Sequence, residues 1–333
     1  MFKKRTVFIV GAGASAEFDL PVGDALKQQI AELLLGAAGS VNSPQISGFR
    51  AMLSRMCPQD HNELLQAGRQ LGAPIKSFVS IDEALHYFSS DPLIVRIGKM
   101  AIAFLILKAE RESKIAKTDR STGLPDLSHA QKTWLAEFLS MALSFLKRDE
   151  IENAFANVQF INFNYDRVVE QFLWSALYVQ AGLPEERARD VAASLRIIHP
   201  YGFLGKLNWQ DRRGVMFGGD GYTENIPQIA ELILTYTEQV DHEKVRHEIG
   251  QALDDAELVI FVGFGFHQQN MALLKTKPRK RQVYATAYRI DKDNHEIFMS
   301  GLAEHANSTV RFFDRTGYDL LSALRPSIMS AAS

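Results

Sequence analysis

Residues 6–16 read TVFIVGAGASA, and this stretch decides the expected fold. A β-prone run leads directly into small residues suited to a tight turn, and apolar residues at helical spacing follow. Gly11, Gly13 and Ala16 match the dinucleotide-binding pattern G-x-G-x-x-G/A in the strand–turn–helix context that this pattern requires. We therefore expect a nucleotide-binding strand–helix unit here, with a plain strand–helix turn as the alternative.

The segment after this unit does not continue as in an ordinary Rossmann oxidoreductase. Such an enzyme has a second strand soon after the first helix and an acidic residue about 20 positions on. Here residues 36–58 are rich in Gly, Ser, Asn and Pro and predict a loop or a poorly ordered insertion. Glu32, the one acid near the expected spacing, lies within the helical pattern. Four helical patterns then follow: His61–Leu71, Ile81–Phe88, Pro92–Lys108 and Ser128–Lys147.

Short β-prone runs return after residue 150. They are Val158–Asn164, Leu195–Tyr201, Leu232–Thr237, Leu258–Gly263, Val283–Tyr288 and Val310–Phe313, with helical stretches between them that include Val168–Val179 and His242–Leu253. This alternation predicts an α/β fold, a Rossmann-like and mostly parallel sheet with helices on both faces. We assign residues 1–36 and 151–333 to this domain and residues 37–150 to a mainly helical insertion or cap.

The composition limits the kinds of function. The 333 residues carry 37 basic and 39 acidic side chains, a net charge of −2 without a long basic run. Binding to nucleic acid or a membrane surface through bulk charge is therefore disfavoured. The single cysteine, Cys57, excludes an internal disulfide and a zinc site of several cysteines. The short apolar stretch before Gly11 fits a buried strand better than a signal peptide, and Met100–Leu107 is too short to span a bilayer. These features predict a cytoplasmic protein.

Polar residues follow the predicted strand that ends near Asn164. Asn162, Asn164 and Asp166 alternate, so they share one side while the chain stays extended. Polar side chains at the carboxyl ends of parallel strands project into the crevice where ligands bind. The alternative is an Asx turn in which Asp166 caps the next helix, which leaves the two asparagines unexplained.

Three later segments also end predicted strands. His199 leaves one strand and is a candidate general base, with a structural histidine as the alternative. The glycine pair of Gly263 and Gly265 permits close approach to a phosphate or ribose, or tight sheet packing. Residues 315–318 follow the last strand, where an adenine-binding loop is expected.

The order of these motifs resembles the SIR2 superfamily, and most of all its zinc-free bacterial SIR2-like domains, which cleave NAD+ in anti-phage defence. The motifs that carry the resemblance are GAGAS at 11–15, N-x-N-x-D at 162–166, a histidine before a glycine, and VGFGF at 262–266. Ser80-Ile81-Asp82 resembles a recurring segment of the bacterial helical insert. The resemblance spans most of the chain, although only the first two motifs are specific.

The resemblance implies roles for individual residues. Asn164 would be the catalytic asparagine, and Asp166 would contact the ribose or the nicotinamide. The pyrophosphate and nicotinamide ribose would face Gly11, Ala12, Gly13 and Ser15. The adenosine ribose would lie beside Gly263, Phe264 and Gly265. The adenine end would lie beside Thr316 and Tyr318.

Two departures from the family pattern affect these expectations. The four-cysteine zinc ribbon of sirtuin deacetylases is absent, so a zinc-dependent deacetylase is not expected. Tyr201 stands directly before Gly202, where the family usually has its histidine, and His199 lies two positions earlier. Two residues along an extended strand share a face about 6.5–7 Å apart, so we expect His199 to serve as the base, with Tyr201 as the alternative.

These observations predict an NAD+ glycohydrolase that releases nicotinamide and ADP-ribose. NAD+ would be the substrate, and no metal would be required. Unregulated NAD+ loss would harm the host cell, so we expect a homo-oligomer and a separately encoded activator or sensor protein. The main alternative is a non-catalytic NAD- or nucleotide-binding regulatory subunit of a defence complex. A flavin or nicotinamide oxidoreductase is a third hypothesis.

Overall fold

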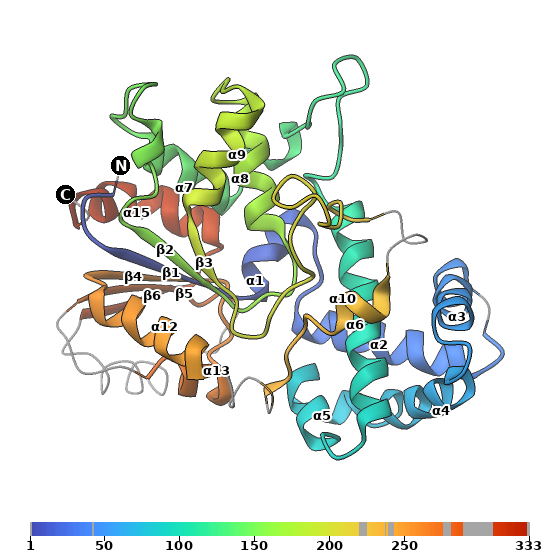
Figure 1. Cartoon of the computed structure of the whole chain (residues 1–333). Helices are drawn as coiled ribbons and strands as arrows, with labels where there is room; N and C mark the ends of the chain where they lie inside the picture. The colour runs from blue at the N-terminus through green and yellow to red at the C-terminus, as the bar shows by residue number, and fades with distance from the viewer. Residues whose placement is uncertain are drawn as a thin grey trace.

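A computed structural model describes residues 2–41, 43–219, 225–236, 238, 243–275, 281–288 and 309–331 of the chain. Its centre is a six-stranded sheet in the order β3-β2-β1-β4-β5-β6, and every neighbouring pair is parallel. The strands are β1 (Thr6–Val10), β2 (Val158–Asn162), β3 (Arg196–Ile198), β4 (Leu258–Val262), β5 (Gln282–Thr286) and β6 (Thr309–Phe313). The predicted Rossmann-like α/β class is confirmed (Figure 1).

Both faces of the sheet are covered by helices, which explains why β4 is apolar throughout and β1 is apolar from Val7 to Val10. On one face, Phe8 and Val10 pack in a core cluster with α7 (Trp134–Leu143), α8 (Val168–Val179), α9 (Glu185–Ser194) and α15 (Gly317–Ala331). On the other face, Val7 and Ile9 belong to a second cluster that includes residues of α12 (Glu243–Asp255). β1 is therefore fully buried, as its uninterrupted apolar run indicates.

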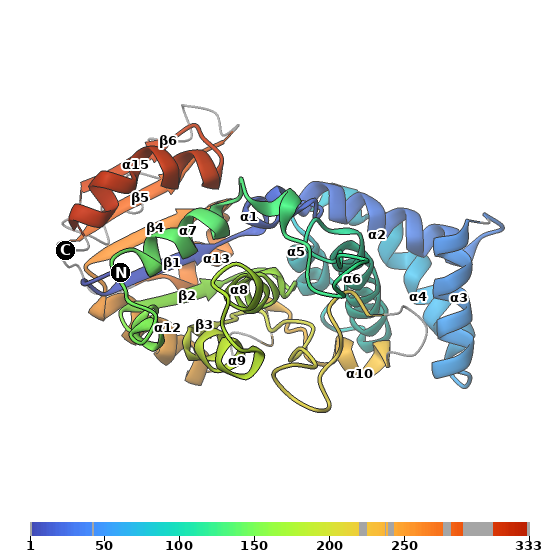
Figure 2. The same ribbon diagram turned by 90° about the horizontal axis from the view of Figure 1, so that it is seen from above.

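A helical block lies beyond the carboxyl-terminal edge of the sheet (Figures 1 and 2). Its helices are α2 (Gly23–Ala38), α3 (Pro44–Met56), α4 (His61–Gly72), α5 (Ile81–Tyr87), α6 (Pro92–Glu112) and α10 (Ile226–Ala230). The second cluster runs through this block, and α6 contributes buried side chains from Ile94 to Leu107 because it is surrounded by other helices.

The remaining elements are short. They are α1 (Ala12–Ser15) and α13 (Gln268–Leu273), with 3₁₀ turns η1 (Ala16–Phe18), η2 (Ile75–Ser77), η3 (Ser128–Ala130) and η4 (Ile151–Asn153). The predicted small-residue turn after β1 therefore contains one turn of helix.

Two predicted segments were wrong. Residues 36–58, expected as a loop, contain α3, whose signal is Ser43 followed by Pro44: the Ser43 hydroxyl accepts a hydrogen bond from the Ile46 N–H over 3.2 Å. The apolar run from Leu232 forms no ladder in its described residues. Ile233 makes an isolated antiparallel bridge to Gly202, and Leu234 N–H donates to the Tyr201 carbonyl.

The helical block and the predicted insertion do not coincide. α2 begins at Gly23, before the predicted boundary, but contacts α4 and α6 of the helical block. α7 lies within the predicted insertion but packs against α15 and the sheet face. The division at residues 36/37 and 150/151 stays a prediction.

Candidate functional site

A large cavity lies at the carboxyl-terminal edge of the sheet, between the strand ends and the helical block. Its volume is about 1030 Å³, at the upper end of the ~300–1000 Å³ of small-molecule sites. It opens beside β1 and β4, where the strand order reverses, which is the usual ligand position in open parallel sheets. The predicted site residues that line it are Gly11, Ala12, Gly13, Ser15, Asn164, Asp166, Gly263, Phe264, Gly265 and Thr316.

The glycines of the first motif allow two loops to meet. The N–H groups of Gly11 and Gly13 donate to the carbonyls of Val262 and Gly263 over 3.0 and 2.9 Å. A Cβ on Gly11 would lie 2.7 Å from the Gly263 oxygen. Gly263 has φ +60°, and a Cβ there would lie 2.0 Å from the Ala14 nitrogen. These two N–H groups therefore hold the loops together and are not available to a pyrophosphate.

Ser15, Asn164 and Asp166 form a buried polar cluster at the base of the cavity. The Asn164 amide Nδ2 donates to the Ser15 Oγ over 2.9 Å and to the Gly11 carbonyl over 3.0 Å. Ser15 Oγ in turn donates to Asp166 Oδ2 over 2.7 Å. Because both Nδ2 hydrogens are used, the Asn164 oxygen Oδ1 is the atom left to accept a hydrogen bond from a ligand.

Asp166 serves the local structure as well as this cluster. Its second oxygen, Oδ1, accepts from the Val168 N–H over 3.1 Å, so the expected Asx turn is present just before α8, whose N-cap position is Arg167. Burial favours the neutral acid and raises the pKa of Asp166 to about 6, although the hydrogen bond from Ser15 acts in the opposite direction. Asp166 thus titrates near neutral pH while it remains in contact with the cavity.

Asn162 plays a different part from Asn164. Its Oδ1 accepts the backbone N–H of Asn164 over 3.1 Å, and it does not line the cavity. The alternation predicted for the N-x-N-x-D motif therefore gives one residue that shapes the loop and two that reach the ligand space.

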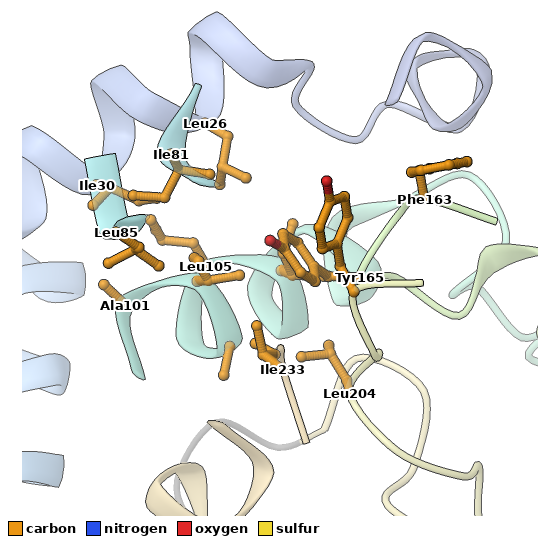
Figure 3. Packing of buried hydrophobic residues seen from close by; sticks show 14 of the residues in the cluster. Leu26, Ile30, Ile81, Leu85, Ala101, Leu105, Phe163, Tyr165, Leu204 and Ile233 are labelled. Atoms are coloured by element: carbon orange, nitrogen blue, oxygen red, sulfur yellow. The ribbon is translucent and has the colours of Figure 1, made fainter. Parts of the chain in front are cut away.

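A second polar group lies on the side of the helical block. The Tyr165 hydroxyl donates to Asp82 of α5, and the Tyr201 hydroxyl donates to Asn270 Oδ1 of α13 over 2.8 Å. Burial raises the pKa of both Asp82 and Tyr165. Figure 3 shows Tyr165 between Phe163 and the apolar side chains of the helical block. The Tyr165–Asp82 pair joins the block to the loop that follows β2, and the Tyr201–Asn270 pair joins the loop that follows β3 to α13.

His199 does not lie in this cavity. β3 ends at Ile198, so the alternation of an extended strand does not extend to His199 and Tyr201. Tyr201 lines the large cavity, whereas His199 lines a separate one and pairs through Nε2 with Glu170 over 3.0 Å. The structure therefore separates His199 from Asn164.

The loop after β6 reaches the cavity through Arg315, Thr316 and Gly317, whereas Tyr318 is not among the lining residues. Thr316 Oγ1 accepts from the Asp319 N–H over 3.2 Å and caps α15. The backbone N–H of Tyr318 donates to Glu17 Oε1 over 2.9 Å. Tyr318 is thus linked to the cavity only through its backbone N–H, which holds the lining residue Glu17.

Glu17 is a lining residue that sequence reasoning missed. Besides Tyr318, it accepts the backbone N–H of Trp134 over 2.7 Å and so joins the first turns of α7 and α15. Burial raises its pKa, although these hydrogen bonds lower it. Lys27, His267 and Asn270 also line the cavity and were not predicted. No local pattern marks them, because their place at the cavity depends on how distant segments pack.

Comparisons with protein-family models, with curated proteins and with solved structures find no match for this chain. Within the described residues, no group of three or more His, Cys, Asp or Glu side chains is placed to hold a metal ion. In the same part of the chain, no helix is both long and apolar enough to cross a membrane. The arguments that follow rest on the fold and on the geometry of the site.

Proposed function

We propose that this chain is an NAD+ glycohydrolase, in which water cleaves the bond between nicotinamide and ribose. The observation that carries the proposal is the cluster of Ser15, Asn164 and Asp166 at the base of a dinucleotide-sized cavity. The cavity lies at the position where parallel sheets with this strand order bind dinucleotides. The resemblance to SIR2-like domains names NAD+ as the substrate.

The cluster suits the charge that develops in this reaction. As the C1′–N bond breaks, positive charge builds on the ribose and the electron pair leaves with nicotinamide. Asp166, whose pKa is about 6, carries a negative charge at neutral pH and would stabilise the oxocarbenium-like ribose. A carboxylate at this position acts without a metal.

Asn164 is the positioning group for the nucleophile in this proposal. Its free acceptor Oδ1 would hold the attacking water or a ribose hydroxyl, because its amide is fixed by Gly11 and Ser15. The water proton would pass through the Ser15 hydroxyl to Asp166, and the products would be ADP-ribose and nicotinamide. This replaces His199 as the proton acceptor.

Regulation remains part of the proposal. An uncontrolled NAD+ hydrolase would deplete the cell that makes it, so the activity would be held in check by oligomerisation and by a separately encoded activator. In this form the chain would be an effector of bacterial anti-phage defence.

A second candidate function is a non-catalytic nucleotide-binding subunit. Two observations favour it: His199 lies outside the cavity, and the N–H groups of Gly11 and Gly13 are already donated within the protein. Such a subunit would bind NAD+ in the same cavity and release no nicotinamide.

The deciding experiment incubates the purified protein with NAD+, alone and with lysate from phage-infected cells, and quantifies nicotinamide and ADP-ribose. Asn164→Ala should lower nicotinamide release about 100-fold or more, while Asn153→Ala, at an exposed position in η4, should leave it unchanged. Binding of NAD+ without release in every condition would support the nucleotide-binding subunit instead. No binding at all would contradict both.

A further inference from the structure

The loop that follows β2 carries the proposed catalytic groups and makes two kinds of contact. Asn164 and Asp166 belong to the polar cluster with Ser15 at the base of the large cavity. Tyr165 and Arg167, which alternate with them in the sequence, contact the helical block instead. The loop is therefore held from the side of the block as well as through the polar cluster.

Two carboxylates of the helical block hold this loop. Glu110 of α6 forms the fully buried ion pair with Arg167, and its Oε1 also accepts the Arg167 backbone N–H over 2.8 Å. Asp82, in the first turn of α5, accepts the Tyr165 hydroxyl. Asp82 and Tyr165 line the large cavity, whereas Glu110 and Arg167 do not. The Asp82–Tyr165 contact is therefore the one that lies at the cavity wall.

The Tyr165 side chain links Asp82 to the loop through a rigid ring. Tyr165 is only 7% exposed, and its backbone carbonyl accepts the Leu204 N–H over 3.1 Å, so both ends of the residue are held. Asn164 and Asp166 are its peptide neighbours, so a shift of Tyr165 would displace both. A displacement of about 1 Å at a reacting group can lower the rate about 100-fold.

The turn that carries Asp82 is itself fixed. The Ser80 hydroxyl accepts the Glu83 N–H over 3.0 Å and caps α5. Lys27 of α2 donates through Nζ to the Phe78 carbonyl over 2.6 Å, just before α5 begins. The carboxylate that receives the tyrosine hydroxyl therefore has a defined position relative to the rest of the block.

We propose that Asp82 is a positioning residue for the proposed reaction: through the Tyr165 hydroxyl it aligns the Asn164 oxygen Oδ1 with the substrate. The alignment of the Asp166 carboxylate depends on the same loop. This role rests on the proposed function, because it concerns the rate of nicotinamide release. Loss of the contact should lower kcat and leave KM for NAD+ unchanged, because neither partner binds the dinucleotide.

The test compares variants under conditions in which circular dichroism shows each of them to be folded. In Asp82→Ala and in Tyr165→Phe, kcat for nicotinamide release should fall about tenfold, with KM for NAD+ within about twofold of the wild type. Asp82→Asn keeps an acceptor oxygen for the hydroxyl, so kcat should return to within about threefold of the wild type. Tyr87→Phe, at an exposed position on the same helix, is the matched control and should change neither constant.

Three results would overturn the positioning role. A rise in KM of more than about threefold in Tyr165→Phe would place the hydroxyl against the substrate. An unchanged kcat in Asp82→Ala would show that the loop is aligned without this contact. A loss in Asp82→Asn as large as that in Asp82→Ala would show that the hydrogen bond is not what matters.

Hydrogen exchange separates this proposal from the proposed function. The backbone N–H groups of Arg167 and Val168 are bonded to carboxylates, and their exchange should become about tenfold faster in Asp82→Ala but not in Tyr87→Phe. Nicotinamide release by the wild type, with unchanged exchange and kcat in Asp82→Ala, overturns only the positioning role. No release by the wild type overturns the proposed function, and faster exchange in Asp82→Ala then still supports Asp82 as the residue that fixes the loop.

Discussion

The side chains of Asn164 and Ser15 are joined by a hydrogen bond of 2.9 Å although they lie 149 residues apart in the sequence. One residue follows β2 and the other ends α1, and the pairing of β1 with β2 brings them together. The parallel sheet thus assembles the proposed site from its strand ends.

Ser15→Ala tests this connection. The substitution leaves the Asn164 amide and the Asp166 carboxylate without their shared partner, so we expect a loss of about 1–2 kcal/mol in the free energy of unfolding. Nicotinamide release should fall at least tenfold, because the path from water to Asp166 is interrupted. Urea denaturation and product quantification measure the two effects. Ser140→Ala, at an exposed position on α7, should change neither.

The close approach of the two glycine loops predicts the effect of Gly263→Ala. The new Cβ would lie 2.0 Å from the Ala14 nitrogen at a φ of +60°, so we expect a loss of about 3 kcal/mol or more. Gly250→Ala on α12, where a Cβ meets no atom within 4 Å, should stabilise the helix by about 0.5–1 kcal/mol. Thermal unfolding measures the stability of both variants. Equal stabilities would contradict the prediction, because they would show that the loops at Gly11 and Gly263 can move apart without loss of stability.

The raised pKa of Asp166 predicts opposite pH trends for activity and stability. Nicotinamide release needs the carboxylate, so it should fall as the pH drops below about 6. The folded pKa exceeds the unfolded one, so the stabilising contribution of Asp166 is full below about pH 4 and is lost as the pH rises through about 6.

Asp166→Asn should remove both trends. The measurements are nicotinamide release and urea denaturation from about pH 4 to pH 7. An activity profile of the wild type that stays flat through pH 6 would assign the charge to another group.

The buried ion pair of Arg167 and Glu110 predicts a large cost for its loss. Both side chains are fully buried, and their closest atoms are 2.6 Å apart. Arg167→Met leaves the Glu110 charge unpaired, so we expect a loss of about 3–5 kcal/mol. Arg187→Met breaks the more exposed pair with Glu152 and should cost less than about 1 kcal/mol. Urea denaturation measures the free energy of unfolding of both variants. Similar losses in the two would mean that the Glu110 carboxylate is paired with another group once Arg167 is replaced.

Much of the fold was readable from local sequence. The apolar run before Gly11 predicted β1, and α8 was predicted with its observed bounds of Val168 and Val179. α3 was missed although Ser43 and Pro44 carry a helix-start signal, because the Gly- and Ser-rich composition around them predicted a loop. The run from Leu232 has strand composition but lies where no neighbouring strand is available to pair with its described residues.

The candidate site shows the same division. The sequence by itself determined that the small residues at 11–15 and the polar residues at 164 and 166 lie at the ends of strands, beside the ligand cavity. Strand ends and turns can be predicted in this way because neighbouring residues encode them. Only the tertiary structure decided that Gly11 and Gly13 bind Gly263 and its neighbour, that Tyr201 lines the large cavity, and that His199 lines another. These outcomes depend on where β3 ends and on contacts between segments far apart in the chain, which no local pattern records.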